Sequence, residues 1–248
     1  MTRHTPQAAA ETPHDLPPGD DDRIQGWGVM GLPFESGDYL SLRCMSASFG
    51  DPYVAIWHRS PEGDWRVLST ADPLHSCERF IGAACTLPSV RTAIETEWLD
   101  ERTLRVHVPE ILDWTIAIRP TVVTRMMSAM GRAMPHWMWM RHSILALMGR
   151  MAGPMLGVGK VRLAGGMPNG QDFTAAPVEI WAVADSRATL GGRDLGAPQA
   201  LSSQAKIGGF WLPQRGIFMR GFGHFDAYDP AVHASAETVN DALQRQAS

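Results

Sequence analysis

Apolar and polar residues alternate along much of the first 120 residues, which is the pattern of half-buried β-strands. The alternation predicts strands at 39–48, 53–59, 65–69, 92–98, 103–108 and 113–119. Pro61 and Gly63 lie between two of these strands, so we expect a hairpin there. In the last of the strands Trp114, Ile116 and Ile118 share one face, which we expect to be buried.

In the middle of the chain the period changes from that of a strand to that of a helix. This part contains nine methionines: Met126, Met127, Met130, Met134, Met138, Met140, Met148, Met151 and Met155. Pro135 should divide it and Pro154 should end it, because proline removes a backbone donor and clashes with the preceding turn. We therefore predict helices near 121–133 and 136–152.

The strand pattern returns after residue 156. It predicts strands at 160–165, 171–174, 178–185, 210–212 and 216–225, and a short helix within 230–245. The predicted fold class is mainly β: a barrel, or two curved antiparallel sheets, with a Met-rich helical insert at 121–156. We expect a single β-rich domain over 23–248, with two β-halves at 23–120 and 157–229, and a disordered acidic tail at 1–22.

Composition and charge exclude several classes of protein. Hydrophobic residues make up 44% of the 248 residues, which is enough for a core and excludes a mainly disordered chain. The net charge of −4 lies wholly in segment 1–22, which holds five acidic residues and one arginine. The remainder is balanced, so we expect no nucleic-acid partner, because such a partner requires many basic residues on one face.

The cysteines and the N-terminal segment bear on the compartment. Cys44, Cys77 and Cys85 are odd in number and lack metal-ligand spacing, so we expect no disulfide framework and no metal site. A reducing cytoplasm fits this usage. Segment 1–22 lacks the basic start and apolar stretch of a secretory signal, and no run of about 18 apolar residues predicts a spanning helix.

The stretch 114–171 has no Asp or Glu but seven basic residues: Arg119, Arg125, Arg132, Arg141, Arg150, Lys160 and Arg162. Three interpretations of its two helices stay open. They can form a core pair whose methionines pack on the sheet, an interfacial pair that binds an anionic membrane, or an adaptable lid over an apolar pocket. The last two are compatible with each other.

Few side chains suggest chemistry. His58 shares a strand face with apolar residues and could serve as a general acid or base, while Asp185 and Arg187 flank Ser186 and could pair or orient a polar ligand head. These three are the catalytic candidates. The ligand-binding candidates are Trp57, His75, Met134, Trp137, Met138, Trp181 and Arg215. No phosphate loop, dinucleotide fingerprint or hydrolase motif is present, so we expect no cofactor.

The many short strands with central tryptophans, together with the segment from Asp185 to Arg193 (DSRATLGGR), resemble the lipocalin-like families. The nearest of these are the carotenoid-hydratase and AttH-type proteins. The resemblance implies two consecutive β-barrel halves that hold an apolar ligand inside. The chain departs from these families in its shorter length and its Met-rich insert, and the resemblance carries over no catalytic residue.

Two functions follow as expectations. The first is binding of an apolar small molecule such as a lipid, isoprenoid or polyketide, with or without a non-redox reaction such as hydration, isomerisation or cyclisation. The second is a non-catalytic lipid carrier, attached peripherally to an anionic membrane through the basic Met-rich helices. Both place the protein in the cytoplasm, in the second case at the membrane surface.

Overall fold

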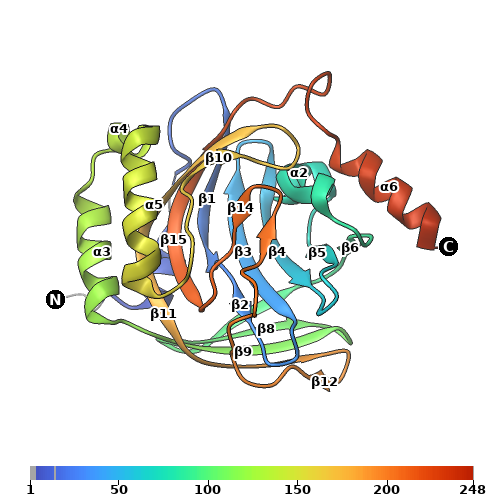
Figure 1. Ribbon diagram of the computed structural model, residues 1–248, viewed down its shortest axis with the longest axis horizontal. Helices are drawn as coiled ribbons and strands as arrows, with labels where there is room; N and C mark the ends of the chain where they lie inside the picture. The colour runs from blue at the N-terminus through green and yellow to red at the C-terminus, as the bar shows by residue number, and fades with distance from the viewer. Residues whose placement is uncertain (1–3, 14, 248) are drawn as a thin grey trace.

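A computed structural model describes residues 4–13 and 15–247 (Figure 1). The protein is mainly β, with 39% of the chain in strands and 24% in helices. The strands are β1 (Asp22–Val29), β2 (Leu32–Pro33), β3 (Tyr39–Ala47), β4 (Gly50–Arg59), β5 (Trp65–Ser69), β6 (Val90–Arg91), β7 (Glu95–Asp100), β8 (Thr103–Val108), β9 (Leu112–Arg119), β10 (Ala164–Gly166), β11 (Asp172–Leu190), β12 (Arg193–Asp194), β13 (Lys206–Ile207), β14 (Phe210–Trp211) and β15 (Ile217–Phe225). The helices are α1 (Pro6–Glu11), α2 (Glu78–Ile81), α3 (Val122–Ala133), α4 (His136–Trp139), α5 (His142–Leu156) and α6 (Ala236–Ala247), with 3₁₀ turns at Pro73–His75 and Gly82–Ala84.

One curled sheet organises the chain. Ten strands follow one another in the order β6-β5-β4-β3-β1-β15-β11-β9-β8-β7, and they form a half-barrel. Strand β15 lies between β1 and β11 and pairs antiparallel with both. The last strand therefore joins the two predicted β-halves into a single sheet.

The inside of the curl is filled with side chains. Buried residues of β3 and β4, such as Leu42 and Ile56, form one cluster with residues of β8 and β9, such as Val106 and Trp114. The Trp114 indole donates to the Ser186 hydroxyl at 2.8 Å, so its polar group is satisfied within this core. The concave face is thus a packed core.

The opposite face of the same strands carries a second core. Alternate residues of β3, β4 and β5, such as Tyr39, Ala55 and Val67, pack there with Phe80 of α2 and Leu212 of the late loops. Both faces of the central strands are therefore apolar, as expected for strands covered on each side.

Helix α3 covers a free edge of the sheet. Strand β11 pairs with β15 along one side, but between its pairings with β10 and β9 its other side meets α3. The Ser128 hydroxyl accepts from the Ile180 amide at 2.9 Å and donates to the Ile180 carbonyl at 3.1 Å, in place of a neighbouring strand. A Cβ on Gly131 would lie 2.3 Å from the Val178 carbonyl oxygen, so only glycine permits this approach.

A buried carboxylate ties the same helix to the sheet. Glu179 of β11 is fully buried and accepts from Arg132 of α3 at 2.9 Å and from Arg220 of β15 at 2.8 Å. His4 lies 3.3 Å from the same carboxylate. Such a pairing is required, because an ionised carboxylate is buried only when it is satisfied.

Most predicted elements are present, and the differences have physical reasons. Segments 171–174 and 178–185 are one continuous strand, β11, because a bulge at Pro177 keeps the pairing with β15. Strand β1 went unpredicted, because Gly26 and Gly28 weaken its strand pattern. Helix α5 continues through Pro154, which is exposed, and ends at Gly157 in the left-handed conformation (φ 65°).

The described residues of segment 1–22 correct the expectation of a disordered tail. Helix α1 begins after Thr5, whose hydroxyl accepts from the Ala8 amide, and Ala9 is buried in the concave core. Further on, Asp21 lies 2.8 Å from His224 and Asp22 pairs with Arg79 at 2.9 Å. Two acidic residues of this segment, Asp21 and Asp22, thus have partners on the folded domain.

The free energy of unfolding should change with pH because of the ionisation of Glu78 of α2. This side chain is buried, and burial raises the pKa of its carboxyl from 4.5 to about 7, against a smaller opposing effect of a hydrogen bond to Ser89. The folded protein then binds more protons than the unfolded chain between those pH values. The neutral carboxyl contributes its full stabilisation below about pH 4.5. The free energy of unfolding then falls by about 3 kcal/mol as the pH rises through about 7.

Glu78→Gln should therefore be more stable than the natural protein at pH 8, and the difference should shrink towards pH 4.5. Urea unfolding at several pH values measures it. A difference that is constant with pH would show that Glu78 is ionised in both states.

Candidate functional site

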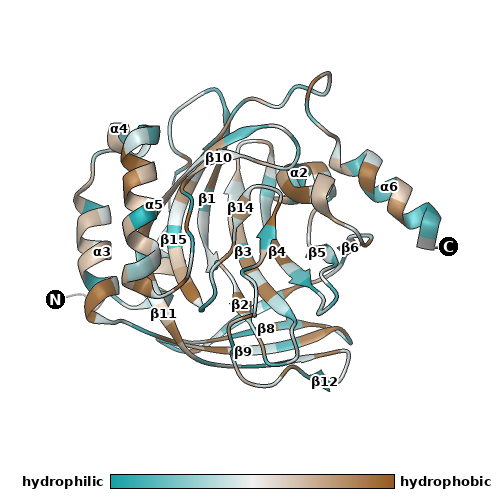
Figure 2. Ribbon diagram, in the orientation of Figure 1, coloured by the Kyte–Doolittle hydropathy of each residue, from teal (hydrophilic) through white to brown (hydrophobic). Residues whose placement is uncertain are grey.

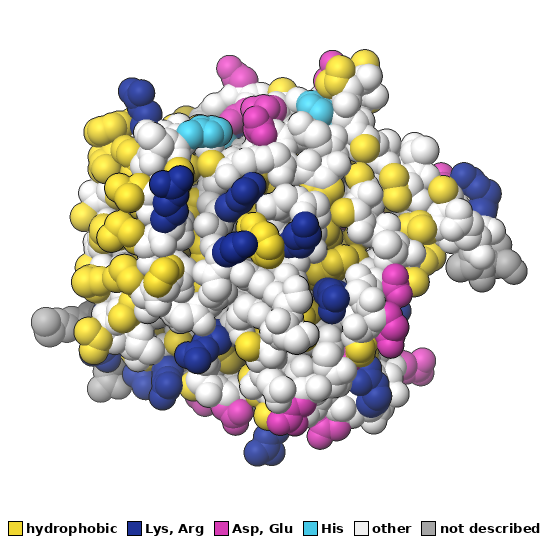
Figure 3. Space-filling view, viewed as in Figure 1, with side chains coloured by type: hydrophobic (Ala, Val, Ile, Leu, Met, Phe, Trp, Pro, Cys, Tyr) yellow, Lys and Arg dark blue, Asp and Glu magenta, His cyan; other side chains and the backbone are white. Residues whose placement is uncertain are grey.

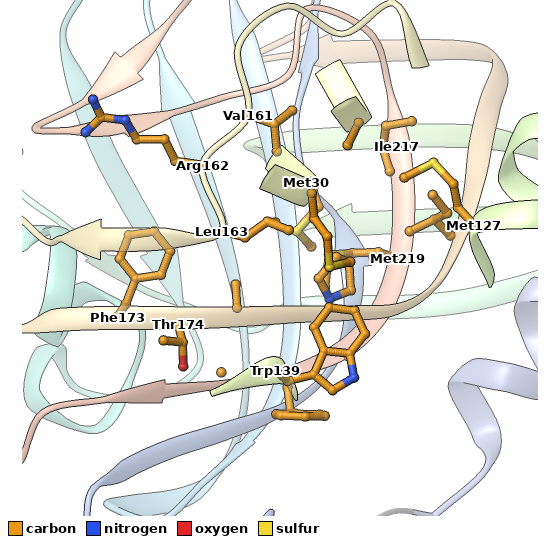
Figure 4. A pocket seen from close by; sticks show the side chains of 18 of the residues that line it. Met30, Met127, Trp139, Val161, Arg162, Leu163, Phe173, Thr174, Ile217 and Met219 are labelled. Carbon is orange, nitrogen blue, oxygen red and sulfur yellow. The ribbon is translucent and has the colours of Figure 1, made fainter. Parts of the chain in front are cut away.

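A cavity of about 800 Å³ lies between the sheet and the Met-rich helices. Its walls come from β1, β3, β4, β11 and β15, from helices α3 to α5, and from the loops around 158–167 and 210–213. Figure 4 shows Met30, Trp139, Leu163 and Met219 converging on one part of this space. The volume is within the range of about 300–1,000 Å³ typical of small-molecule sites.

The cavity lies outside the curl of the half-barrel. Ile24 of β1 and Tyr53 of β4 line it, and they lie on the opposite strand faces from Val29, which belongs to the concave core, and Val54, which packs against it. The Met-lined cavity is therefore not inside the barrel, where we expect a ligand from the sequence; the concave side is largely filled by aromatic and aliphatic side chains and keeps a cavity of about 400 Å³ lined by Ala9, Trp27 and Val54 among others.

Methionine dominates the walls. Twelve of the fourteen methionines line the cavity: Met30, Met45, Met126, Met127, Met130, Met134, Met138, Met148, Met151, Met155, Met167 and Met219. Methionine side chains are flexible and polarisable, so a surface built from them adapts to ligands of different shape.

The helices leave these methionines free because they dock through small residues. The buried face of α3 consists of Thr124, Ser128 and Gly131, and that of α5 consists of Leu145 and the small residues Gly149, Ala152 and Gly153. Methionines therefore face the cavity and the solvent. One of the three interpretations, a core pair whose methionines pack on the sheet, does not hold for Met126 and Met151, whose exposed fractions are 53% and 54%.

The exposed apolar side chains gather on this side of the molecule. Ten large hydrophobic residues in the described part of the chain are exposed, and eight of them lie between 122 and 155: Val122, Met126, Met130, Trp137, Met140, Leu147, Met151 and Met155. Figure 2 shows the hydrophobic stretches of α3 and α5, and Figure 3 shows hydrophobic side chains gathered where these helices lie, with Lys or Arg beside them. We call these eight residues the helical apolar patch.

Among the residues that the structure describes, only two lining side chains carry a charge, and both are arginines. Arg43 of β3 is 5% exposed, and Arg162 is exposed at the rim. Arg43 donates to the carbonyls of Val29 at 2.8 Å, Leu42 at 3.0 Å and Met30 at 3.3 Å. Burial lowers the pKa of this guanidinium, although arginine stays protonated in proteins.

The polar neighbours of Arg43 are neutral. Its guanidinium lies over the Trp57 ring at 4.4 Å, and the Trp57 indole donates to the Cys77 sulfur at 2.9 Å. Burial raises the pKa of the Cys77 thiol to about 11 and that of Tyr53 well above its usual value. The Tyr53 hydroxyl is buried and makes no hydrogen bond of good geometry, although it lies near Cys77.

Three of the predicted ligand-binding residues line the cavity: Trp57, Met134 and Met138. The other four do not. Trp181 is buried in the concave core, Trp137 is 59% exposed in the helical apolar patch, and His75 and Arg215 are exposed in loops.

His58 is held in a polar network on the concave side. Its Nε2 lies 2.8 Å from the Asp38 carboxylate, and its Nδ1 accepts from the Arg66 guanidinium at 3.2 Å. The proton is therefore assigned to Nε2. Burial, with a smaller contribution from Arg66, lowers the pKa of His58; hydrogen bonds from His58, Ser36 and Arg193 lower the pKa of Asp38 against the effect of its burial. A neutral imidazole with both nitrogens occupied has a structural role.

Asp185 and Arg187 are exposed on β11 and do not join His58. The Asp185 carboxylate accepts from the Ser186 amide at 2.9 Å, and the described residues contain no ion pair of Asp185 with Arg187. The three catalytic candidates thus form no common site.

Sequence reasoning missed Arg43 and Cys77. A signal for Arg43 existed, because it shares a strand face with Tyr39 and Met45 in a strand that is apolar on both faces. Cys77 comes from a loop, so no periodicity could place it beside Trp57.

Comparisons with protein-family models, with characterised proteins and with solved structures gave no match. The resemblance to lipocalin-like families therefore stays a prediction. In the described part of the chain, no three His, Cys, Asp or Glu side chains gather as a metal ion would require, and no helix is both long and apolar enough to cross a membrane.

Trp57 and His58 offer a matched test, because they are adjacent in β4 and point to opposite faces. Trp57→Ala should weaken binding of a fluorescent apolar probe, since it removes part of the cavity wall. His58→Ala should leave probe binding unchanged but lower the free energy of unfolding by about 1–3 kcal/mol, because the buried Asp38 loses a partner. Equal effects of both changes on probe binding would contradict the assignment of the cavity to one face.

Proposed function

We propose that the protein binds an apolar small molecule, of the lipid, isoprenoid or polyketide class, in the Met-lined cavity. The observation that carries the proposal is the cavity of about 800 Å³ lined by twelve of the fourteen methionines. An apolar lining excludes water and gives favourable free energy in proportion to the ligand area buried, about 25 cal/mol per Å².

The lining residues favour binding over a reaction. The walls include no His, Asp, Glu or Lys side chain among the described residues. The groups that could exchange a proton, Tyr53 and Cys77, remain protonated near neutral pH because burial raises the pKa of each. A hydration or isomerisation requires a general acid or base within reach of the substrate, so a carrier or binding protein is the better proposal.

A second part of the proposal concerns delivery of the ligand. Met126, Met130 and Met151 belong both to the cavity wall and to the helical apolar patch. Arg125, Arg141 and Arg150 are exposed on or beside the same helices. Apolar side chains beside arginines suit an anionic membrane surface, and a ligand could pass from the lipid phase into the cavity between these methionines.

Filling the cavity should weaken ligand binding. Ala175 lines the cavity, so Ala175→Phe should occupy ligand space and weaken probe binding by about tenfold or more, the loss expected from about 1.4 kcal/mol. Ala117→Phe on the outer side of β9 is the control and should bind normally. Native mass spectrometry of the purified proteins gives the readout: co-purified apolar compounds should be lost only from Ala175→Phe, and equal occupancy of the two variants would refute the site.

Membrane attachment should depend on the helical arginines. Replacing Arg125, Arg141 and Arg150 by Gln should lower binding to anionic liposomes about 100-fold, at about 1 kcal/mol per residue. Arg132 is left in place, because it pairs with the buried Glu179.

The matched control replaces three exposed arginines elsewhere, Arg91, Arg102 and Arg187, by Gln. Vesicle co-sedimentation measures both triple variants. If both bind vesicles equally, the helices do not form the membrane surface.

A further inference from the structure

We infer that the ligand is an acidic amphipath, a long-chain carboxylic acid whose carboxylate binds Arg43 inside the cavity. The inference rests on the proposed function and specifies the ligand class. It follows from a buried positive charge that has no negative partner among the described residues.

The charge of Arg43 is not balanced within the described structure. The side chain is 5% exposed, and no described Asp or Glu lies within 4.0 Å of it. By contrast, buried Asp38 and Glu179 each have at least one arginine partner. Because a buried charge is costly unless it is paired, Arg43 is the position at which an anion would gain most.

The backbone contacts of Arg43 leave donors for a ligand. A guanidinium carries five N–H groups, and the described contacts to the carbonyls of Val29, Met30 and Leu42 account for three. These neutral carbonyls hold the side chain in place but do not neutralise it. Two N–H groups remain, which is the number that a bidentate carboxylate accepts.

A second donor lies beside the arginine. In the β3–β4 register Arg43 faces Ala55, and Met45 faces Tyr53, so Tyr53 is the diagonal neighbour of Arg43 on the same face. Tyr53 is 2% exposed, its hydroxyl has no partner of good geometry, and it lines the cavity. The pair can therefore present a cation and a hydroxyl donor to one carboxylate.

The surroundings select the kind of acid. One buried cation balances one negative charge, which suits a carboxylate better than a phosphate monoester with its charge of about −1.5 to −2. The cavity that Arg43 lines is also lined by Met45 and Trp57 and by methionines of α3 and α5. A long hydrocarbon chain fits such a wall, and its free end would lie towards the helical apolar patch.

The test compares hexadecanoic acid with hexadecan-1-ol, which have the same chain length and differ in the headgroup. Each ligand displaces a fluorescent apolar probe from the natural protein, from Arg43→Gln and from Arg162→Gln. The natural protein should prefer the acid by about 10–100-fold, the range expected for hydrogen bonds to charged groups. Arg43→Gln should lose this preference while still binding the alcohol, and Arg162→Gln should keep it.

The outcomes separate the two proposals. If the natural protein binds neither compound, the proposed function is wrong. If it binds both equally, the cavity takes apolar ligands and the inference of an acid is wrong. If the preference is lost in Arg162→Gln and kept in Arg43→Gln, the headgroup lies at the rim and Arg43 is not its site.

A measurement on the natural protein covers the case in which Arg43→Gln fails to fold. The carboxyl ¹³C signal of bound [1-¹³C]hexadecanoic acid is followed by NMR from about pH 8 to about pH 5. Beside Arg43 the carboxylate should stay ionised throughout, because a neighbouring cation lowers its pKa. Protonation within this range would mean that the headgroup lies in an apolar environment without a cation, and it would overturn the inference.

Discussion

The structure depends on the hydrogen bonding of β15, which pairs with β1 on one side and with β11 on the other. Without these two ladders the N-terminal strands and the strands around the Met-rich insert would be separate sheets. The resulting sheet is long enough to curl, and its concave face then closes on itself as a packed core. Because the inside is largely filled, the concave side keeps a cavity of about 400 Å³, and the Met-lined cavity of about 800 Å³ lies on the other face, where helices and loops form the cover.

Helices α3 and α5 cover this face of the sheet and dock on it in a particular way. Small residues of α3 and α5 lie directly against backbone, so the helices approach closely while their methionines remain available. The Ser128 hydroxyl and the Glu179 ion pairs fix α3 on the edge of β11. Rigid attachment of the helix backbone and adaptable side chains on its free face are therefore combined in one element, which suits a site that admits flexible apolar molecules.

The buried charged side chains differ in whether a partner of opposite charge lies beside them. On the concave side, the Asp38 carboxylate accepts hydrogen bonds from His58 and Arg193. Near the edge of β11, the Glu179 carboxylate accepts from Arg132 and Arg220. The polar groups around Arg43 are neutral instead. An anionic ligand headgroup would pair with Arg43 in the same way as the Asp38 and Glu179 carboxylates pair with their arginines.

Much of the secondary structure could be predicted, because alternation in β3, β4, β8 and β9 and helical periodicity in the Met-rich insert are local properties of the chain. The same local pattern marked Trp57, Met134 and Met138, which do line the cavity. It could not show that His58 faces Asp38 and Arg66, since those residues come from a turn and from another strand. Nor could it place Arg43 beside Cys77, because the loop that brings them together is positioned only by tertiary packing.

The sequence by itself determined the secondary-structure elements, the basic segment without Asp or Glu, and the large number of methionines. Only the tertiary structure decided which face of the sheet carries the Met-lined cavity and where the buried Arg43 lies without a described acidic partner. Both depend on how the sheet curls, because the pairings between β1, β15 and β11 join residues far apart in the chain.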